Sequence, residues 1–300
     1  MEDVVMIILT FFRSNSYRVA LPSSFGTCHA GAMIALRAHV QRLCRNNGIQ
    51  LNTDAGQHFL IDERVLGDIV RLAGIRSEDH VLEIGAGCGI LTRALLKHAR
   101  RVTAIEWDRR WIPVLEAETG ARDLPAGTLT IVNANALKVE PPPAPYVVVA
   151  NIPYHITAPL LRHLFLDAPH PPRRATLLVQ REVADKLVIA PPATFLGVLV
   201  GLVGKAARLR IVPPSAFLPP PAVDSAVLQI DAHEPPLASR ETIAETLRLA
   251  SAAFAGRRKM LRRTIGAFHG GMERLAAAAI EPTRRPETLS IDEWIALGRA

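Results

Sequence analysis

Short apolar runs rich in β-branched residues alternate with helix-like segments from residue 80 onward. The segment 90–98, for example, has helical spacing. The runs lie at residues 80–84 (HVLEI), 102–106 (VTAIE), 129–132 (LTIV) and 146–150 (YVVVA). Strands that are apolar throughout are typical of a parallel sheet covered by helices on both faces. The alternation therefore predicts an α/β fold.

Two further runs extend the predicted sheet, at residues 175–180 and 226–230, and we expect the second to be an antiparallel edge strand. Residues 232–239 are typical of a linker, and residues 241–254 have the pattern of a helix. The sequence thus predicts three parts. They are an N-terminal extension of uncertain role at 1–50, a main α/β domain at 51–231 and a small helical domain at 240–300.

Composition narrows the class of protein and of partner. The chain has 300 residues, 49% of them hydrophobic, which is typical of a globular protein, and no apolar run reaches the roughly 18 residues of a membrane span. Three widely spaced cysteines predict a reducing compartment and no metal site. The net charge of +7 favours a polyanionic partner such as a nucleic acid.

The first fifty residues allow two interpretations. The apolar run at 4–12 follows Glu2 and Asp3 rather than a basic segment, which argues against a secretory signal. Residues 13–42 contain Arg and Ser and no acid, as mitochondrial presequences do, but Met33 is an equally good start. We favour the second interpretation and expect a cytoplasmic rather than a mitochondrial protein.

A glycine-rich turn follows the first strand of the alternation, in the segment 82–92 (LEIGAGCGILT). Gly85, Gly87 and Gly89 allow the positive φ and close backbone approach that a turn around a nucleotide requires. A dinucleotide fingerprint would have its last glycine at position 90, which is Ile90. The spacing therefore favours a nucleotide-like ligand without a pyrophosphate, and a plain tight turn is the alternative.

The next two strands end in polar residues that suit a nucleoside. Glu106 ends the second strand, where a carboxylate can accept hydrogen bonds from both ribose hydroxyls, and a solvated loop acid is the alternative. Asn135 follows the third strand, and its side-chain oxygen can accept from an adenine N6 amine. An Asx turn is the alternative interpretation of Asn135.

The fourth strand leads into the motif Asn151, Ile152, Pro153, Tyr154. An adenine amine is a weak nucleophile because its lone pair is delocalised into the ring. The Asn151 side-chain oxygen and the Ile152 carbonyl can each accept one N–H, which aims the lone pair at a sulfonium methyl group. Tyr154 offers a stacking face for an extruded base. This chemistry needs no general base, so we expect His155 to be structural. The alternative interpretation of the motif at 151–154 is a plain proline turn after a strand.

Together these motifs resemble the ribosomal RNA adenine N6-dimethyltransferase family, including its KsgA-type small-subunit enzymes and the macrolide-resistance methylases. The resemblance covers roughly residues 51–265. The sequences of the matching segments look closer to those of archaeal members than to those of bacterial members. It implies a Rossmann-like class I methyltransferase sheet with a small C-terminal helical domain. It also implies S-adenosylmethionine as cofactor, and a monomer acting on small-subunit ribosomal RNA in a pre-30S particle.

The resemblance also implies roles for individual residues. His58 and Leu60, in GQHFL at 56–60, would touch the methionine part of the cofactor, and Asn151 would border it. Phe217, in the segment 212–225, would clamp the target base opposite Tyr154. Basic residues that follow the predicted helix would contact RNA, and a solvated surface is their alternative. They are Arg257, Arg258, Lys259, Arg262 and Arg263.

Two departures from the family pattern qualify the resemblance. Asn135 stands where the family usually has Asp, and we expect this neutral group to weaken adenine recognition without abolishing it. Leu196 and Gly197 replace a common Tyr-Gly. Two other functions stay open: a nucleic-acid-binding factor of this fold with little catalysis, and an adenine methyltransferase that acts on another RNA or on DNA.

Overall fold

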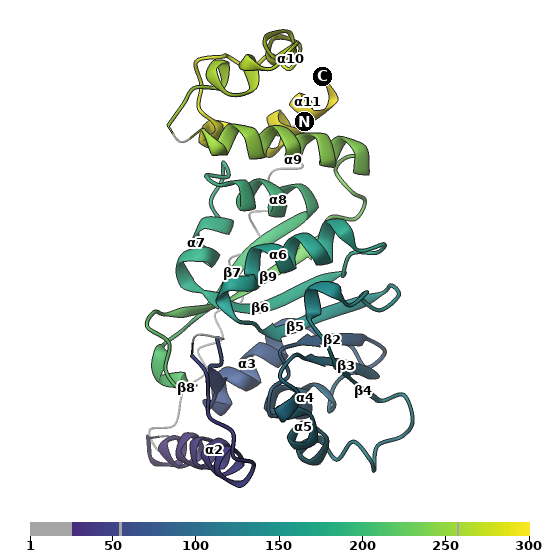
Figure 1. Ribbon diagram of the computed structural model, residues 1–300, viewed down its shortest axis with the longest axis vertical. Coiled ribbons are helices and arrows are strands. Elements are labelled where there is room, and N and C mark those ends of the chain that lie inside the picture. The colour runs from purple at the N-terminus through teal and green to yellow at the C-terminus, as the bar shows by residue number, and fades with distance from the viewer. Residues whose placement is uncertain (1–25, 54–55, 257) are drawn as a thin grey trace, which may run out of the picture.

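The computed structural model describes residues 26–53, 56–256 and 258–300, with side chains of the first helix from residue 35. The apolar run at 4–12, the start of the Arg- and Ser-containing segment and the predicted RNA-contacting Arg257 lie outside the described residues. Within them the chain forms a mixed sheet with helices on both faces and a helical region at one end (Figure 1).

A seven-stranded sheet forms the centre of the described chain. Its order is β4 (Leu129–Asn133), β3 (Arg101–Glu106), β2 (His80–Ile84), β5 (Tyr146–Asn151), β6 (Arg174–Gln180), β9 (Ser225–Ala232) and β7 (Gly204–Val212). The strands from β4 to β6 are parallel, and β9 pairs antiparallel with both β6 and β7. Their shared direction brings the carboxyl ends of β2, β3, β4 and β5 to one edge, which confirms the predicted α/β architecture.

The predicted edge strand at 226–230 is antiparallel, but it is not at the edge. β9 lies between β6 and β7, and β7 is the edge strand that the sequence pattern does not reveal. Charged side chains at Lys205, Arg208 and Arg210 interrupt its apolar pattern. Such cations are common on edge strands because they discourage pairing with another chain. A β-bulge between Arg208 and Arg210 disturbs the strand further.

Alternate strand residues supply two hydrophobic cores, as a period of two requires. Leu82 and Val148 face the cluster formed with α6 (Thr157–Arg162) and α8 (Phe195–Val203). Val81 and Val147 face the opposite cluster with α3 (Glu63–Ala73) and α4 (Ile90–Leu95). The remaining helices of this region are α5 (Ile112–Thr119) and α7 (Arg181–Leu187).

Several short elements link the larger ones. They are the strands β1 (Phe59–Leu60) and β8 (Phe217–Leu218), the π-helical turn η4 (His163–Asp167), and the 3-10 turns η1 (Arg109–Trp111), η2 (Ala136–Lys138), η3 (Tyr154–Ile156), η5 (Pro214–Ala216), η6 (Leu261–Arg263), η7 (Ile265–Ala267) and η8 (Pro286–Thr288). β1 and β8 form a separate antiparallel pair.

The C-terminal helices pack on α8 rather than standing apart. α9 (Arg240–Ala255) begins after the N-cap Ser239, where the linker ends. α10 (Gly271–Ala277) and α11 (Ile291–Arg299) complete this region, and Trp294 of α11 is fully buried. Its side chain belongs to the same hydrophobic cluster as α6 and α8, so the core is continuous across the linker. The division into separate domains stays a prediction.

The described part of the N-terminal extension forms α2 (Gly26–Asn46), which lies at the end of the molecule opposite α9 and α10 (Figure 1). Val40 is fully buried and packs with Cys88, Trp111 and Val114. α2 is therefore part of the folded body. None of the helices in the described residues has both the length and the apolar character needed to cross a membrane.

Candidate active site

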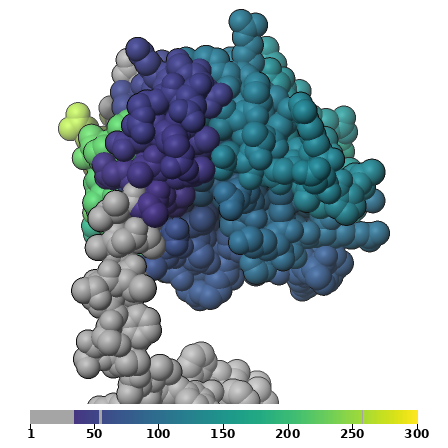
Figure 2. Space-filling view, turned by 90° about the horizontal axis from the view of Figure 1, so that it is seen from below, coloured from purple at the N-terminus to yellow at the C-terminus, as the bar shows by residue number. Residues whose placement is uncertain are grey.

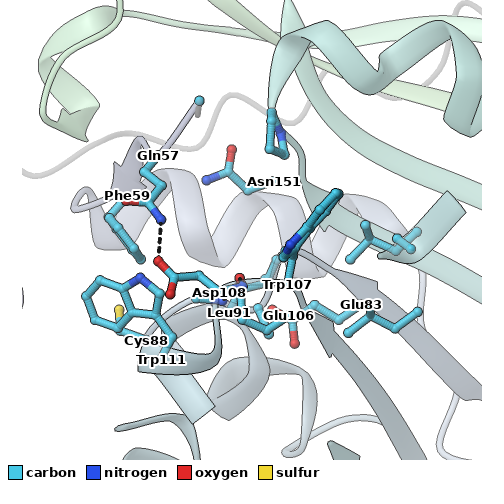
Figure 3. A pocket seen from close by; sticks show the side chains of 18 of the residues that line it. Gln57, Phe59, Glu83, Cys88, Leu91, Glu106, Trp107, Asp108, Trp111 and Asn151 are labelled. Carbon is cyan, nitrogen blue, oxygen red and sulfur yellow. Dashed lines mark hydrogen bonds between the residues drawn. The ribbon is translucent and has the colours of Figure 1, made fainter. Parts of the chain in front are cut away.

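A pocket of about 760 Å³ opens where the parallel strands β2 to β5 end (Figure 3). A crevice at the carboxyl ends of such strands is the usual ligand site of open α/β sheets. Many of the predicted site residues line it: His58, Leu60, Gly85, Gly87, Glu106, Asn135, Asn151 and Pro153. Four others lie outside its lining: Gly89, Ile152, Tyr154 and Phe217.

The glycine turn has the geometry that its sequence predicts. Gly85, Gly87 and Gly89 all have positive φ, at 75°, 54° and 85°. Gly87 has a second constraint, because a Cβ there would lie 2.6 Å from the Phe59 ring. The turn can therefore pack under the 56–60 segment only with glycine at this position. Its backbone stays open toward the pocket.

Glu106 is fixed by the turn and by its own loop. Its Oε2 accepts from Gly87 N at 2.8 Å and its Oε1 accepts from Asp108 N at 2.7 Å. Burial raises the pKa of Glu106, and these backbone hydrogen bonds partly oppose that effect. Each carboxylate oxygen can accept further bonds, so the side chain is held in place with acceptor capacity left for a diol.

Glu83 is a pocket residue to which the sequence analysis gave no role. Its side chain is 1% exposed, and neither carboxyl oxygen has a hydrogen-bond partner among the described residues. Burial raises its pKa to about 8; the nearby Thr92 hydroxyl opposes this effect, and the charge on Glu106 adds to it. A buried acid without a partner is costly unless it stays protonated or meets a cation. The carboxylate in LEIGAGCG was visible in the sequence, but its burial was not.

Asn135 forms the Asx turn that was the alternative interpretation of this residue. Its Oδ1 accepts from Leu137 N at 3.0 Å, and the side chain caps η2 as an Asx turn. The residue still lines the pocket. The predicted acceptor atom is thus already used once, which leaves one lone pair for a ligand.

Asn151 ends β5 with its amide group oriented. Its Nδ2 donates to the His58 carbonyl at 2.9 Å, so the amide nitrogen points to the 56–60 segment and Oδ1 remains as an acceptor. Figure 3 shows Asn151 across the pocket from Glu106 and Asp108. Ile152 follows the last paired residue of β5, so its carbonyl lies beyond the strand ladder. The structure brings the two predicted acceptors to one strand end.

The two predicted aromatic residues have different surroundings. Tyr154 is partly exposed, its hydroxyl lies 2.6 Å from Ser225 Oγ, and its ring stacks with His58 at 6.1 Å between centroids. Phe217 is fully buried in the cluster below β1. In this conformation Phe217 presents no face to a base, so its clamping role stays a prediction that requires the ring to be uncovered.

The 56–60 segment crosses one side of the pocket and is held at two points. Leu60 pairs with Phe217 in the β1–β8 ladder, which joins two segments far apart in sequence. Gln57 Nε2 donates to Asp108 Oδ2 at 3.0 Å, and Gln57 Oε1 accepts from Asn52 N at 2.9 Å. A hydrogen bond from Arg110 is the main cause that lowers the pKa of Asp108 to about 2. The roles of Gln57 and Asp108 are not apparent from the sequence, because they depend on a contact between distant segments.

Two exposed side chains line the pocket. Trp107, which follows Glu106, is 69% exposed. His155 is also exposed, and its expected structural role stays a prediction. Both lie in loops after strands, where exposure depends on the fold rather than on local pattern.

The described basic residues after α9 are exposed and lie outside the pocket. They are Arg258, Lys259, Arg262 and Arg263. Within the described chain none of the four forms an ion pair. They are therefore available to an external anion.

Comparison with known proteins gives a consistent result. The chain is 41% identical over 267 residues to ribosomal RNA small subunit methyltransferase A of Anaeromyxobacter dehalogenans, with 82% of this chain and 91% of the relative covered. The protein of the same name from Novosphingobium aromaticivorans is 38% identical over 263 residues, with 84% and 94% covered. Both relatives are bacterial, so they lend no support to a closer likeness to archaeal members.

Solved structures show the same fold. The dimethyladenosine transferase from Plasmodium falciparum superposes with a TM-score of 0.68 at 26% identity, covering 80% of this chain and 96% of that one. The 23S rRNA methyltransferase ErmE gives 0.62 at 28%, covering 80% and 98%. The sheet is thus a Rossmann-like class I methyltransferase fold. The family model described as ribosomal RNA adenine dimethylase matches residues 48–298. The chain therefore belongs to the ribosomal RNA adenine dimethylase family.

Proposed function

We propose that the protein transfers methyl groups from S-adenosylmethionine to N6 of adenines in small-subunit ribosomal RNA, giving dimethyladenine during ribosome biogenesis. The observation that carries the proposal is Asn151 at the end of β5. Its amide nitrogen is bound by the His58 carbonyl, so its Oδ1 is fixed as an acceptor at the pocket. The names of the 41% and 38% identical relatives support the substrate.

The pocket residues fit this cofactor. Glu106 would accept from the ribose hydroxyls, and Gly85 and Gly87 line the pocket where the backbone of the turn can approach the nucleoside closely. The buried Glu83 carboxyl keeps its proton in the ligand-free pocket, and it would become a carboxylate beside a ligand that carries a sulfonium and an ammonium group. When bound, the cofactor supplies an electrophilic methyl group. Glu83, Glu106, Asn135 and Leu60 would hold it.

The catalytic work of the chain is to prepare the amine. In the first transfer, Asn151 Oδ1 and the Ile152 carbonyl each accept one amine N–H, which draws the lone pair onto nitrogen and directs it at the methyl donor. The monomethylated amine keeps one N–H, so one of the two acceptors orients it for the second transfer. Pro153 and the hydrogen bond between the Tyr154 and Ser225 hydroxyls keep the strand end rigid. The Tyr154 ring offers a stacking surface to the base. The proton leaves after methyl transfer, so no strong base is required.

Exposed cations and a net charge of +7 support RNA as the partner. Four unpaired basic residues after α9 would bind phosphates, while the extruded adenine is chosen in the pocket. We further propose that the substrate particle is a pre-30S subunit, that the enzyme acts as a monomer and that it works in the cytoplasm.

The proposal is tested with labelled S-adenosylmethionine and small subunits purified from cells that lack this methylation. We expect label in ribosomal RNA and N6,N6-dimethyladenine after nuclease digestion and chromatography. Parallel reactions with DNA and with protein substrates serve as controls. RNA binding without methyl incorporation would overturn the proposal in favour of a binding factor, and faster transfer to DNA would assign a different substrate.

A further inference from the structure

The exposed face of α2 carries three arginines and no acid. The helix sequence contains no Asp or Glu, and Arg42 and Arg45 are exposed while Arg37 is half-buried. Within the described residues none of the three forms an ion pair with a carboxylate. We call Arg37, Arg42 and Arg45 the α2 basic face. Figure 2 shows α2 at the surface at this end of the molecule.

The opposite face of α2 fixes this surface beside the pocket. Val40 packs with Cys88 and Trp111, and both of these residues line the pocket. His39 Nε2 donates to Glu118 Oε2 at 2.7 Å, while Arg42 donates to His39 Nδ1 at 2.7 Å. α2 is thus attached to the shell of the active site, and its basic face has a set position relative to the pocket.

Nearby acids do not neutralise these charges. Glu118 already contacts His39 and Arg93, and Asp108 is bound by Arg110 and Gln57. A further exposed cation, Arg109, lines the pocket itself and forms no ion pair in the described part of the chain.

The spacing of the arginines favours a polyanion over a small ligand. Arg37 and Arg45 are eight residues apart on one helix, about 12 Å along its axis. One phosphate or carboxylate cannot reach both, whereas successive phosphates of a nucleic acid can. The basic residues after α9 lie at the other end of the molecule (Figure 1). A long RNA can contact both ends while one adenine enters the pocket.

We propose that the α2 basic face binds the phosphate backbone of the RNA whose adenine enters the pocket, as a second RNA-binding surface. This inference rests on the proposed function. α2 precedes residues 48–298, so it lies outside the region that the family model matches.

The test compares two double variants that remove equal charge. Arg37→Gln with Arg45→Gln alters the α2 basic face and leaves the bond between Arg42 and His39. Arg76→Gln with Arg101→Gln is the matched control, because both side chains are exposed and lie at the amino ends of the strands, away from the pocket. The affinity for undermethylated small subunits is measured from 50 to 300 mM salt.

We expect the α2 variant to bind about tenfold more weakly and to lower the salt slope by about 1 to 2, since each lost phosphate contact removes nearly one counterion. Its Tm and its S-adenosylmethionine Kd should equal those of the unaltered protein. Arg37→Lys with Arg45→Lys should restore most of the binding, because the charge is kept.

Equal affinity and slope in the α2 variant and the control would overturn the inference while the unaltered protein still binds and methylates the subunits. If the unaltered protein neither binds nor methylates them, the proposed function fails as well. The two failures are thus distinguished by the unaltered protein alone.

Discussion

The amide nitrogen and the amide oxygen of Asn151 have different roles. Its Nδ2 is bound by the His58 carbonyl, and its Oδ1 is left for the substrate. We expect Asn151→Ala to lower kcat about 100-fold or more, because one acceptor of the amine is lost. The Kd for S-adenosylmethionine should change less than threefold. Single-turnover methyl transfer and calorimetry measure the two effects, and near-normal turnover would contradict the proposed alignment of the lone pair.

Glu83 should make the stability of the ligand-free protein depend on pH. Burial raises its pKa to about 8, above the ordinary value of 4.5, so the folded state keeps a proton that the unfolded state releases between these values. Stability must then fall as pH rises through this window. We expect the Tm of Glu83→Gln relative to the unaltered protein to rise by about 5 °C from pH 5 to pH 8.5. Parallel melting curves across pH would show that Glu83 is solvated.

At the level of elements, the segment that carries β1 acts as a strap along the pocket. Gln57 ties it to Asp108 on the loop after β3, and β8 pairs with it on the other side. We expect Gln57→Ala to weaken S-adenosylmethionine binding about fivefold, which is the value of one hydrogen bond. Gln50→Ala is the matched control, since Gln50 is exposed and does not line the pocket. The same loss in both variants would rule out a specific role of the strap.

The strands show which elements a sequence can reveal. The strands β2, β3 and β5 were predictable to within a residue because each is a mainly apolar run that is largely buried on both faces. β7 was not, because an edge strand with Lys205, Arg208 and Arg210 has no such signal. The same reason explains the placement of β9, whose position depends on a partner that the pattern does not show.

The site was predictable where function depends on residue type at a strand end. The glycine turn, Glu106 and Asn151 lie at the carboxyl ends of β2, β3 and β5, which are neighbours in the sheet, so the parallel sheet alone brings them together. Contacts between distant segments were not predictable. The bond from Asn151 to His58 and the pairing of Leu60 with Phe217 depend on how the chain returns to the pocket.

On the scale of the whole molecule, charge should control RNA affinity. We expect replacement of the four described cations after α9 by Gln to flatten the salt dependence of RNA binding by about 3, because up to four phosphate contacts are lost. These residues are Arg258, Lys259, Arg262 and Arg263. Methyl transfer at saturating RNA should stay within about twofold, since the pocket is untouched. An unchanged slope would mean that these side chains are only solvated.

Trp107 also gives the whole protein an optical probe. Its indole is 69% exposed at the pocket, whereas Trp111 and Trp294 are 1% and 0% exposed. Indole emission moves to longer wavelength in water, so the red edge of the fluorescence spectrum comes mainly from this one side chain, as does the fraction that iodide can quench. A ligand that fills the pocket shields that ring. The fraction of protein with an occupied pocket can therefore be measured on the unlabelled protein by a fluorescence titration.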